Sequence, residues 1–401
     1  MNACTYGMAH AARNAGATLT AVLFLAGMEV QAAPLRLAIY YGYPSLINGA
    51  NGNLERAVAV FSDYDIVVLG DGLEFDPARP GQAAGHADHA FTKRIIQQLG
   101  LTPRRSQVYG YVDLGGTQHL PAAAVAERIE LWARMGAAGV FLDEAGYDFG
   151  VSRERQNAAV AAAHRHGLSV CVNAFYPNDV LSEVATPLNR AGGGNPTGLA
   201  PVIGPGDAVL LESFAVREGI PEAVDRLAER TRAALDGRVR FGTRVFAVST
   251  SADAAPRAAA SPDRSADQRL ADYAWWMGSL FGIDAFGGGM PAFSAITSLL
   301  PWVERPPAEA ALAGAEYVSE PVFGDGRWRR GTTAGTIVVD PTTGRGALEP
   351  IGSPIAGRHD ARPMANWNPS SQPAVPVHPG APRGALRAET LNAEARTTWD
   401  R

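Results

Sequence analysis

The stretch "GVFLDEAGYD", residues 139–148, places two adjacent carboxylates, Asp143 and Glu144, directly after a short apolar run. That run combines β-branched, aromatic and aliphatic residues, which is typical of a buried strand. A buried acid is unfavourable unless it is paired or takes part in chemistry. The end of this predicted strand is therefore the first candidate for a functional site.

Seven similar runs alternate with longer amphipathic segments along the rest of the chain. We predict strands over 35–42, 64–70, 107–114, 138–144, 168–174, 208–214, 239–248 and 281–288, and helices over 53–61, 91–100, 121–136, 152–167, 220–235 and 264–280. Apolar strands that alternate with helices predict a parallel sheet covered by helices. Eight such units within 33–300 favour a (β/α)8 TIM barrel. A doubly wound open sheet is the alternative, but the loop after the first strand lacks a phosphate-binding glycine motif.

The two ends of the chain differ in character from the barrel. Arg13 precedes an apolar run and a small-residue site, which predicts a cleaved export signal over 1–32. An uncleaved N-terminal anchor is the alternative, although the run is short for crossing a bilayer. We predict a small β-rich extension over 301–353 and a disordered tail over 354–401. The signal predicts a secreted or periplasmic protein without a membrane span after cleavage.

Composition excludes some partners. The formal net charge of the 401 residues is -5, and no basic stripe exists to neutralise phosphates, so we expect no nucleic acid partner. Cys171 would be the single cysteine after signal cleavage, which rules out an intramolecular disulfide. His86 and His89 lie in a polar stretch without a third ligand at a suitable spacing. We therefore expect a monomer without a cofactor and without a metal.

Barrel enzymes carry their reactive residues at the carboxyl ends of the strands and in the loops that follow. Polar and aromatic residues gather at those positions in this sequence. The candidate site residues are Tyr41, Tyr43, Asp71, Asp113, Asp143, Glu144, Asn173, Tyr176, Glu212 and Arg244. A single acid at such a place is often a helix cap, and Asp148, just before a predicted helix, is interpreted in that way.

Asp143, Glu144 and Glu212 are harder to explain as structural residues. Two carboxylates that face each other across a barrel can cleave a glycosidic bond, one protonating the leaving oxygen and the other attacking or stabilising the sugar cation. We assign Asp143 as nucleophile or electrostatic stabiliser and Glu212 as general acid/base. Glu144 would perturb Asp143 through its like charge. Because successive strand residues point to opposite faces, the roles of Asp143 and Glu144 could be exchanged.

The stretches 139–175 and 207–214 resemble those of the (β/α)8 glycoside hydrolases of the endo-α-1,4-polygalactosaminidase and spherulin-4-like type. The resemblance covers residues 35–290. It implies an endo-acting hydrolase of galactosamine-containing polysaccharide, with catalytic carboxylates at Asp143, Glu144 and Glu212. It also implies that Asp113 and Asn173 line the cleft.

A second class of function fits the same residues. A catalytically silent carbohydrate-binding or envelope-associated barrel could use the same cleft and aromatic side chains. Tyr43 and Tyr176 would stack on sugar rings in either case. Loss of turnover with retained ligand affinity in a Glu212→Gln variant would distinguish the enzyme from the binder.

Overall fold

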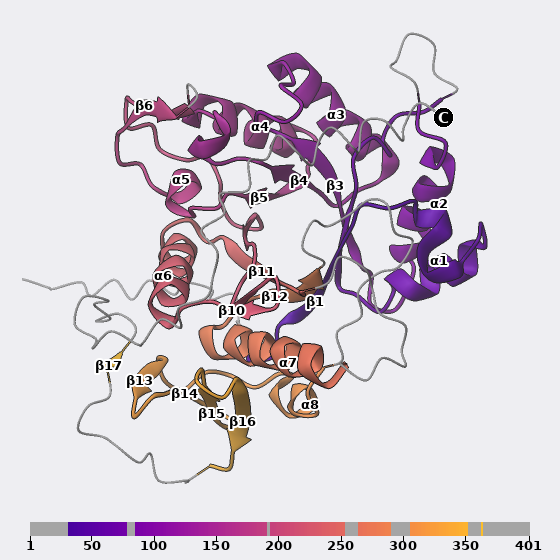
Figure 1. The fold of residues 1–401 in the computed structure, drawn as a ribbon. Coiled ribbons are helices and arrows are strands. Elements are labelled where there is room, and N and C mark those ends of the chain that lie inside the picture. Colours follow the sequence, from indigo (N-terminus) through magenta and orange to yellow (C-terminus); the bar gives the residue numbers. More distant parts are fainter. Residues whose placement is uncertain are drawn as a thin grey trace, which may run out of the picture. The chain divides into compact units, whose positions relative to one another are not determined.

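The computed structural model describes residues 31–77, 85–190, 193–252, 264–289, 305–351 and 362–363. Eight parallel strands close into a barrel in the order β1-β12-β11-β8-β5-β4-β3-β2 (Figure 1). This confirms the predicted TIM barrel. The strands are β1 (Leu35–Tyr40), β2 (Ile66–Leu69), β3 (Gln107–Asp113), β4 (Gly139–Asp143), β5 (Ser169–Asn173), β8 (Ala208–Leu211), β11 (Arg244–Thr250) and β12 (Ala285–Gly289). Nearly all of the predicted export signal and most of the predicted tail lie outside the described residues.

Amphipathic helices surround the strands (Figure 1). They are α1 (Leu54–Phe61), α2 (His89–Leu99), α3 (Ala122–Met135), α4 (Arg153–Arg165), α6 (Val224–Phe241) and α7 (Arg264–Phe281). The prediction that Asp148 caps α4 is wrong, because the hydroxyl of Ser152 accepts the Arg155 N–H at 3.3 Å. The predicted strand over 239–248 begins too early, because α6 continues to Phe241 and ends at Gly242 in the left-handed conformation.

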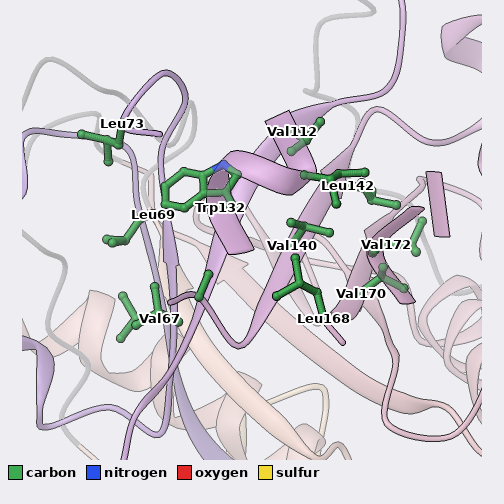
Figure 2. Close-up of a cluster of buried hydrophobic side chains, with 14 of the residues drawn as sticks. Val67, Leu69, Leu73, Val112, Trp132, Val140, Leu142, Leu168, Val170 and Val172 are labelled. Carbon is green, nitrogen blue, oxygen red and sulfur yellow. The ribbon is translucent and has the colours of Figure 1, made fainter. Parts of the chain in front are cut away.

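Two separate apolar layers hold the barrel together. The outer layer packs the strands against the helices, and Figure 2 shows Val112, Val140 and Leu142 of the strands around Trp132 of α3. The inner layer fills the barrel itself with alternating residues of the strands. It contains Leu37, Ile39, Ile66, Val68, Tyr109, Phe141, Cys171, Ala208, Leu210, Phe246, Val248 and Ala285. Side chains in a strand point alternately to its two faces. A residue two positions from an inner-layer residue therefore also points into the barrel, and the residue between them points toward the helices.

This alternation decides which polar residues point into the barrel. Phe141 belongs to the inner layer, so Asp143, two residues later, points inward and Glu144 does not. Asn173 stands two residues after Cys171, and Glu212 two residues after Leu210, so both also point inward. Three predicted site residues therefore meet at the carboxyl end of the barrel, at the top of the inner layer.

A small antiparallel sheet follows the barrel, as predicted. Its order is β16-β15-β14-β13-β17, and it packs on α7 with Trp328 5.1 Å from Phe281, measured between ring centres (Figure 1). The elements are α8 (Ala308–Leu312), β13 (Val322–Gly324), β14 (Arg327–Thr332), β15 (Gly335–Asp340), β16 (Arg345–Glu349) and β17 (Arg362–Pro363). Because β17 pairs with β13, these two residues of the predicted tail belong to the sheet.

The loops between the strands contain shorter helices and strands. They are η1 (Pro44–Gly49), η2 (Tyr147–Phe149), α5 (Asn178–Leu181), the hairpin β6 (Thr186–Arg190) and β7 (Gly193–Asn195), and the pair β9 (Val216–Arg217) and β10 (Ile220–Pro221). No helix within the described part of the chain is both long enough and apolar enough to cross a membrane.

Candidate active site

Asn173 connects the two carboxylates that the sequence singled out. Its amide nitrogen Nδ2 donates hydrogen bonds of 2.8 Å to Asp143 Oδ1 and 3.0 Å to Glu212 Oε2. The three residues come from β4, β5 and the end of β8, and all three side chains are only partly buried. The structure thus brings three of the predicted site residues into one hydrogen-bonded group.

Asp143 has several donors around it. Burial raises its pKa, and hydrogen bonds from Asn173, from the backbone N–H of Glu144 and from the Tyr111 hydroxyl act in the opposite direction. Donors to a carboxylate favour its charged form. These donors therefore offset part of the effect of burial on Asp143.

Glu212 has a less supportive environment. Burial raises its pKa, and the nearby charge of Asp143 raises it further. The bond from Asn173 and the positive charges of Arg230 and Arg217 oppose this effect. Asn173 is the one side chain among the described residues that donates to the Glu212 carboxylate. Two neighbouring carboxyl groups with such different surroundings suit an anion and a proton donor.

Glu144 is directed away from this pair. Its backbone is left-handed, with φ of 52°, and its side chain accepts bonds from the backbone N–H of Thr117 at 2.9 Å and from the Thr117 hydroxyl. Gly115 fits tightly against it, since a Cβ there would lie 2.5 Å from Glu144 Cβ. Glu144 thus anchors the loop after β3. Its like charge raises the pKa of Asp113, and the charge of Asp143 raises the pKa of Glu144.

Asp113 lies fully buried at the end of β3, directly beside Asp143 in the strand register. The backbone N–H of Gly115 opposes the rise of the pKa of Asp113, but neither carboxylate oxygen has a hydrogen bond of good geometry among the described residues. Burial, together with the charges of Glu144 and Asp143, raises its pKa to about 7. Because Asp113 is fully buried, it has no exposed surface for direct contact with a ligand in this conformation.

Asp71 is engaged in a network with a buried arginine. Arg128 of α3 bonds Asp71 through Nη2, Gln118 at 2.8 Å through Nη1 and Glu74 at 2.5 Å through Nε. Glu74 is completely buried, and burial raises its pKa to about 7 although Arg128 opposes this. The side chain of Asp71 is 46% exposed. This network fixes the loops after β2 and β3 to each other.

Aromatic side chains surround the carboxylates unevenly. Tyr41 packs edge-on against Tyr111 at 5.3 Å between ring centres, and both pack on the inner layer of the barrel. Tyr43 lies 4.8 Å from the ring of His86, and Tyr176 lies 4.9 Å from Phe175 and is 44% exposed. Exposure at this end of the barrel leaves Tyr176 able to stack on a ligand.

The prediction that Arg244 lies at the carboxyl end of its strand is wrong. Arg244 is the first residue of β11, and its Nη2 donates a 2.9 Å bond to the Tyr109 hydroxyl and a 3.4 Å bond to Gln107. Gln107 is the first residue of β3, so this group lies at the amino end of the barrel. The error arose because the strand was predicted to begin five residues too early.

Tyr111 was not selected from the sequence, although the signal was present. It stands two residues before Asp113 in the same predicted strand, so the period of two places both on the inner face. Its hydroxyl donates to Asp143. Within the described residues no group of three or more His, Cys, Asp and Glu side chains is arranged to hold a metal ion.

Comparison with known proteins adds a likeness of fold. No family model matches the chain, and no curated protein matches it. Among solved structures, the glycoside hydrolase domain of PelA from Pseudomonas aeruginosa is 18% identical, with a TM-score of 0.39, covering 68% of this chain and 100% of that one. Ega3 from Aspergillus fumigatus, solved in complex with galactosamine, is 12% identical, with a TM-score of 0.37 and coverage of 68% and 96%. The 7,8-dihydropteroate synthase from Vibrio fischeri also matches, at 13% identity, a TM-score of 0.32 and coverage of 65% and 88%.

Proposed function

We propose that this protein is a glycoside hydrolase that cleaves a polysaccharide with Asp143 and Glu212. The observation that carries the proposal is the pair of carboxylates bonded to the single nitrogen Nδ2 of Asn173 at the carboxyl end of the barrel. That end is where barrel enzymes carry their chemistry. Two carboxyl groups at close range, one charged and one protonated, are what glycosidic cleavage requires.

The hydrogen bonds divide the two roles. Asp143 receives three donors, which oppose the rise of its pKa on burial, so we assign to it the ionised role that a nucleophile needs. Glu212 has a single side-chain donor and faces the charge of Asp143, so it holds its proton more readily and serves as general acid. Glu144 positions the loop after β3 through Thr117 and takes no direct part in this proposal.

The close approach of one oxygen from each carboxyl group favours retention of configuration in this proposal. Asp143 Oδ1 and Glu212 Oε2 can be separated by no more than the two bonds to Asn173, 2.8 Å and 3.0 Å, laid end to end. Retaining enzymes hold their carboxyl groups about 5–5.5 Å apart, whereas inverting enzymes need about 6.5–9.5 Å to admit a water. We infer a covalent intermediate on Asp143, with Glu212 returning as general base to activate water.

An amino sugar is the substrate class that fits the charges. Asp113, Asp143 and Glu212 lie close together, and in the described part of the chain no Lys, Arg or His forms an ion pair with any of them. A cationic ammonium on the ligand would stabilise the ionised form of Asp143, beside which Arg230 and Arg217 supply positive charge only toward Glu212. We therefore propose a hexosamine-containing polysaccharide, with galactosamine as the first candidate. The predicted export signal is consistent with a polymer outside the cytoplasm.

The test is reducing-end release by the purified protein from a panel of hexosamine and neutral polysaccharides. Wild type is compared with Asp143→Asn and Glu212→Gln, and Asp236→Asn serves as control because Asp236 is an exposed residue of α6. We expect release from the hexosamine polymers alone and its loss in both site variants. Anomeric proton NMR of the first product would show retention.

The opposite result also has a clear meaning. Binding of oligosaccharide without release by wild type would contradict the hydrolase and favour the carbohydrate-binding barrel. Release that survives in both site variants would show that other residues carry the reaction.

A further inference from the structure

A buried arginine connects the two strand ends that carry Asn173 and Glu212. Arg230 belongs to α6, and its side chain is 10% exposed. Its Nη2 donates a 2.7 Å bond to the backbone oxygen of Glu212. Its guanidinium carbon also lies 5.1 Å from the centre of the Phe175 ring, two residues after Asn173. Arg230 therefore contacts both segments whose side chains bond each other in the site.

The turn after Glu212 needs such support. Ser213 and Ala215 both adopt left-handed backbone conformations, with φ of 53° and 59°. A non-glycine residue in this conformation is strained, and it persists only where surrounding contacts hold it. The bond from Arg230 fastens the first residue of this turn, and the backbone N–H of Glu222 fastens Ala215 at 2.9 Å.

Glu222 completes the support by holding the arginine itself. Both of its carboxylate oxygens accept from Arg230 Nη1, at 3.1 Å and 3.2 Å, and the Glu222 side chain is 9% exposed. A buried carboxylate on the guanidinium fixes its orientation. The contacts thus run from Glu222 through Arg230 to the Glu212 peptide.

We propose that Arg230 is a positioning residue for Glu212, fixing its peptide beyond β8 and placing a buried positive charge beside its carboxyl group. The proposal rests on the function proposed above. The charged and titratable groups that act on Glu212 are Asp143 of β4, Arg230 of α6, Arg217 of β9 and the phenol of Tyr41 after β1. The side chain of Arg217 is 59% exposed and is screened by water, so Arg230 is the buried cation that opposes Asp143.

Replacement of Arg230 should therefore change the titration of Glu212 as well as the geometry. In Arg230→Gln we expect kcat to fall about 10- to 100-fold with KM changed less than about two-fold, because a misplaced group loses rate rather than binding. The alkaline limb of the kcat/KM profile, which reports the protonated acid, should move to higher pH. Arg230→Lys should restore the position of that limb and part of kcat.

Arg226 provides the matched control. It lies 5.4 Å from the Phe175 ring centre and 3.7 Å from Glu222, as a second arginine of α6 on the same two groups. It has no hydrogen bond to Glu212 among the described contacts. Arg226→Gln should leave kcat and the alkaline limb at wild-type values. A loss in Arg226→Gln equal to that in Arg230→Gln would overturn the specific role of Arg230.

A readout without substrate separates this inference from the proposed function. Carbon-13 NMR of labelled glutamate, with Glu212→Gln to assign the signal, reports the titration of Glu212 directly. A higher midpoint in Arg230→Gln supports the inference even if wild type hydrolyses no glycan, in which case only the proposed function fails. A folded Arg230→Gln with unchanged midpoint and kcat overturns it. If Arg230→Gln does not fold, Glu222→Gln takes its place, and wild-type kcat and midpoint in a folded Glu222→Gln would overturn the inference.

Discussion

Asp113 and Asp143 are register partners on the neighbouring strands β3 and β4, yet they meet opposite conditions. Asp143 accepts a hydrogen bond from Asn173, whereas both oxygens of Asp113 are buried without a partner in the described residues. Burial and the charges of Glu144 and Asp143 raise the pKa of Asp113 to about 7. The barrel therefore favours the neutral form of Asp113 directly beside Asp143, whose three donors oppose the effect of its burial.

This difference predicts a pH dependence of stability. The pKa of Asp113 is about 7 in the folded protein, above its usual value in an unfolded chain, so the unfolded state ionises first as pH rises. The stabilisation that the folded protein gains from the raised pKa of Asp113 is complete below about pH 4. It is lost as pH rises from about 4 to 7, and the free energy of unfolding then no longer changes through this group. Asp113→Asn should match wild type at pH 4 and exceed it at pH 8 by a few kcal/mol, measured by urea unfolding.

Asp236→Asn is the control for this measurement. Asp236 is 67% exposed on α6, so its replacement should leave the free energy of unfolding parallel to that of wild type at every pH. An Asp113→Asn protein that is no more stable than wild type at pH 8 would show that Asp113 is ionised without penalty.

Removal of the Asn173 amide should affect both carboxylates together. Its Nδ2 is shared between Asp143 and Glu212, and the two bonds lower the pKa of each. In Asn173→Ala we expect both limbs of the pH–rate profile to move to higher pH, with kcat reduced roughly 100-fold. Movement of one limb alone would mean that Asn173 serves only one of the two groups.

Glu144→Gln should be far milder than Asp143→Asn. Glu144 faces Thr117 rather than Asn173, and a glutamine can still accept the Thr117 N–H. We expect Asp143→Asn to lose at least about 1,000-fold in kcat and Glu144→Gln to lose less than about 10-fold, measured on the same polysaccharide. Equal losses of kcat in the two variants would mean that Glu144 is a catalytic residue, as predicted from the sequence.

The fold was predictable because the barrel repeats one signal eight times. Each apolar strand followed by an amphipathic helix adds independent support, so an error at a single boundary does not change the architecture. The strand ends were predictable for the same reason, and Asp143, Asn173 and Glu212 do lie together. Arg244 shows the limit, because the helix before it continues to Phe241 and moves the start of the strand.

Partners across the barrel could not be predicted from the sequence. The choice between Asp143 and Glu144 depended on strand phase, which the inner position of Phe141 settles. The bond from Arg230 to the Glu212 peptide spans 18 positions and involves a helix surface that looks ordinary in the sequence. Such contacts depend on how α6 packs on β8, a property of three-dimensional packing alone.

The ion pair between Arg128 and Glu74 predicts that substitutions of these two residues have non-additive effects on the free energy of unfolding. Glu74 is fully buried, and Arg128 is its one hydrogen-bond partner in the described structure. Arg128→Met would leave this carboxylate buried and unpaired, which costs about 3–5 kcal/mol at pH 8. The double variant with Glu74→Leu should recover much of that loss, as urea unfolding of the four proteins of the cycle would show. Additive losses would mean that the pair is not coupled.

Arg244 offers a test of where the site ends. Its bonds to the hydroxyl of Tyr109 and to Gln107 lie at the amino end of the barrel, below the inner apolar layer. Arg244→Gln should therefore leave kcat and KM on the polysaccharide within about two-fold of wild type, while it lowers the free energy of unfolding by about 1 kcal/mol through the lost bond to Tyr109. Asn173→Ala, assayed in parallel, should show the reverse pattern of large kinetic and small stability effects. A raised KM in Arg244→Gln would mean that the ligand reaches through the barrel, which the packed layer of Phe141, Leu210 and Phe246 does not allow.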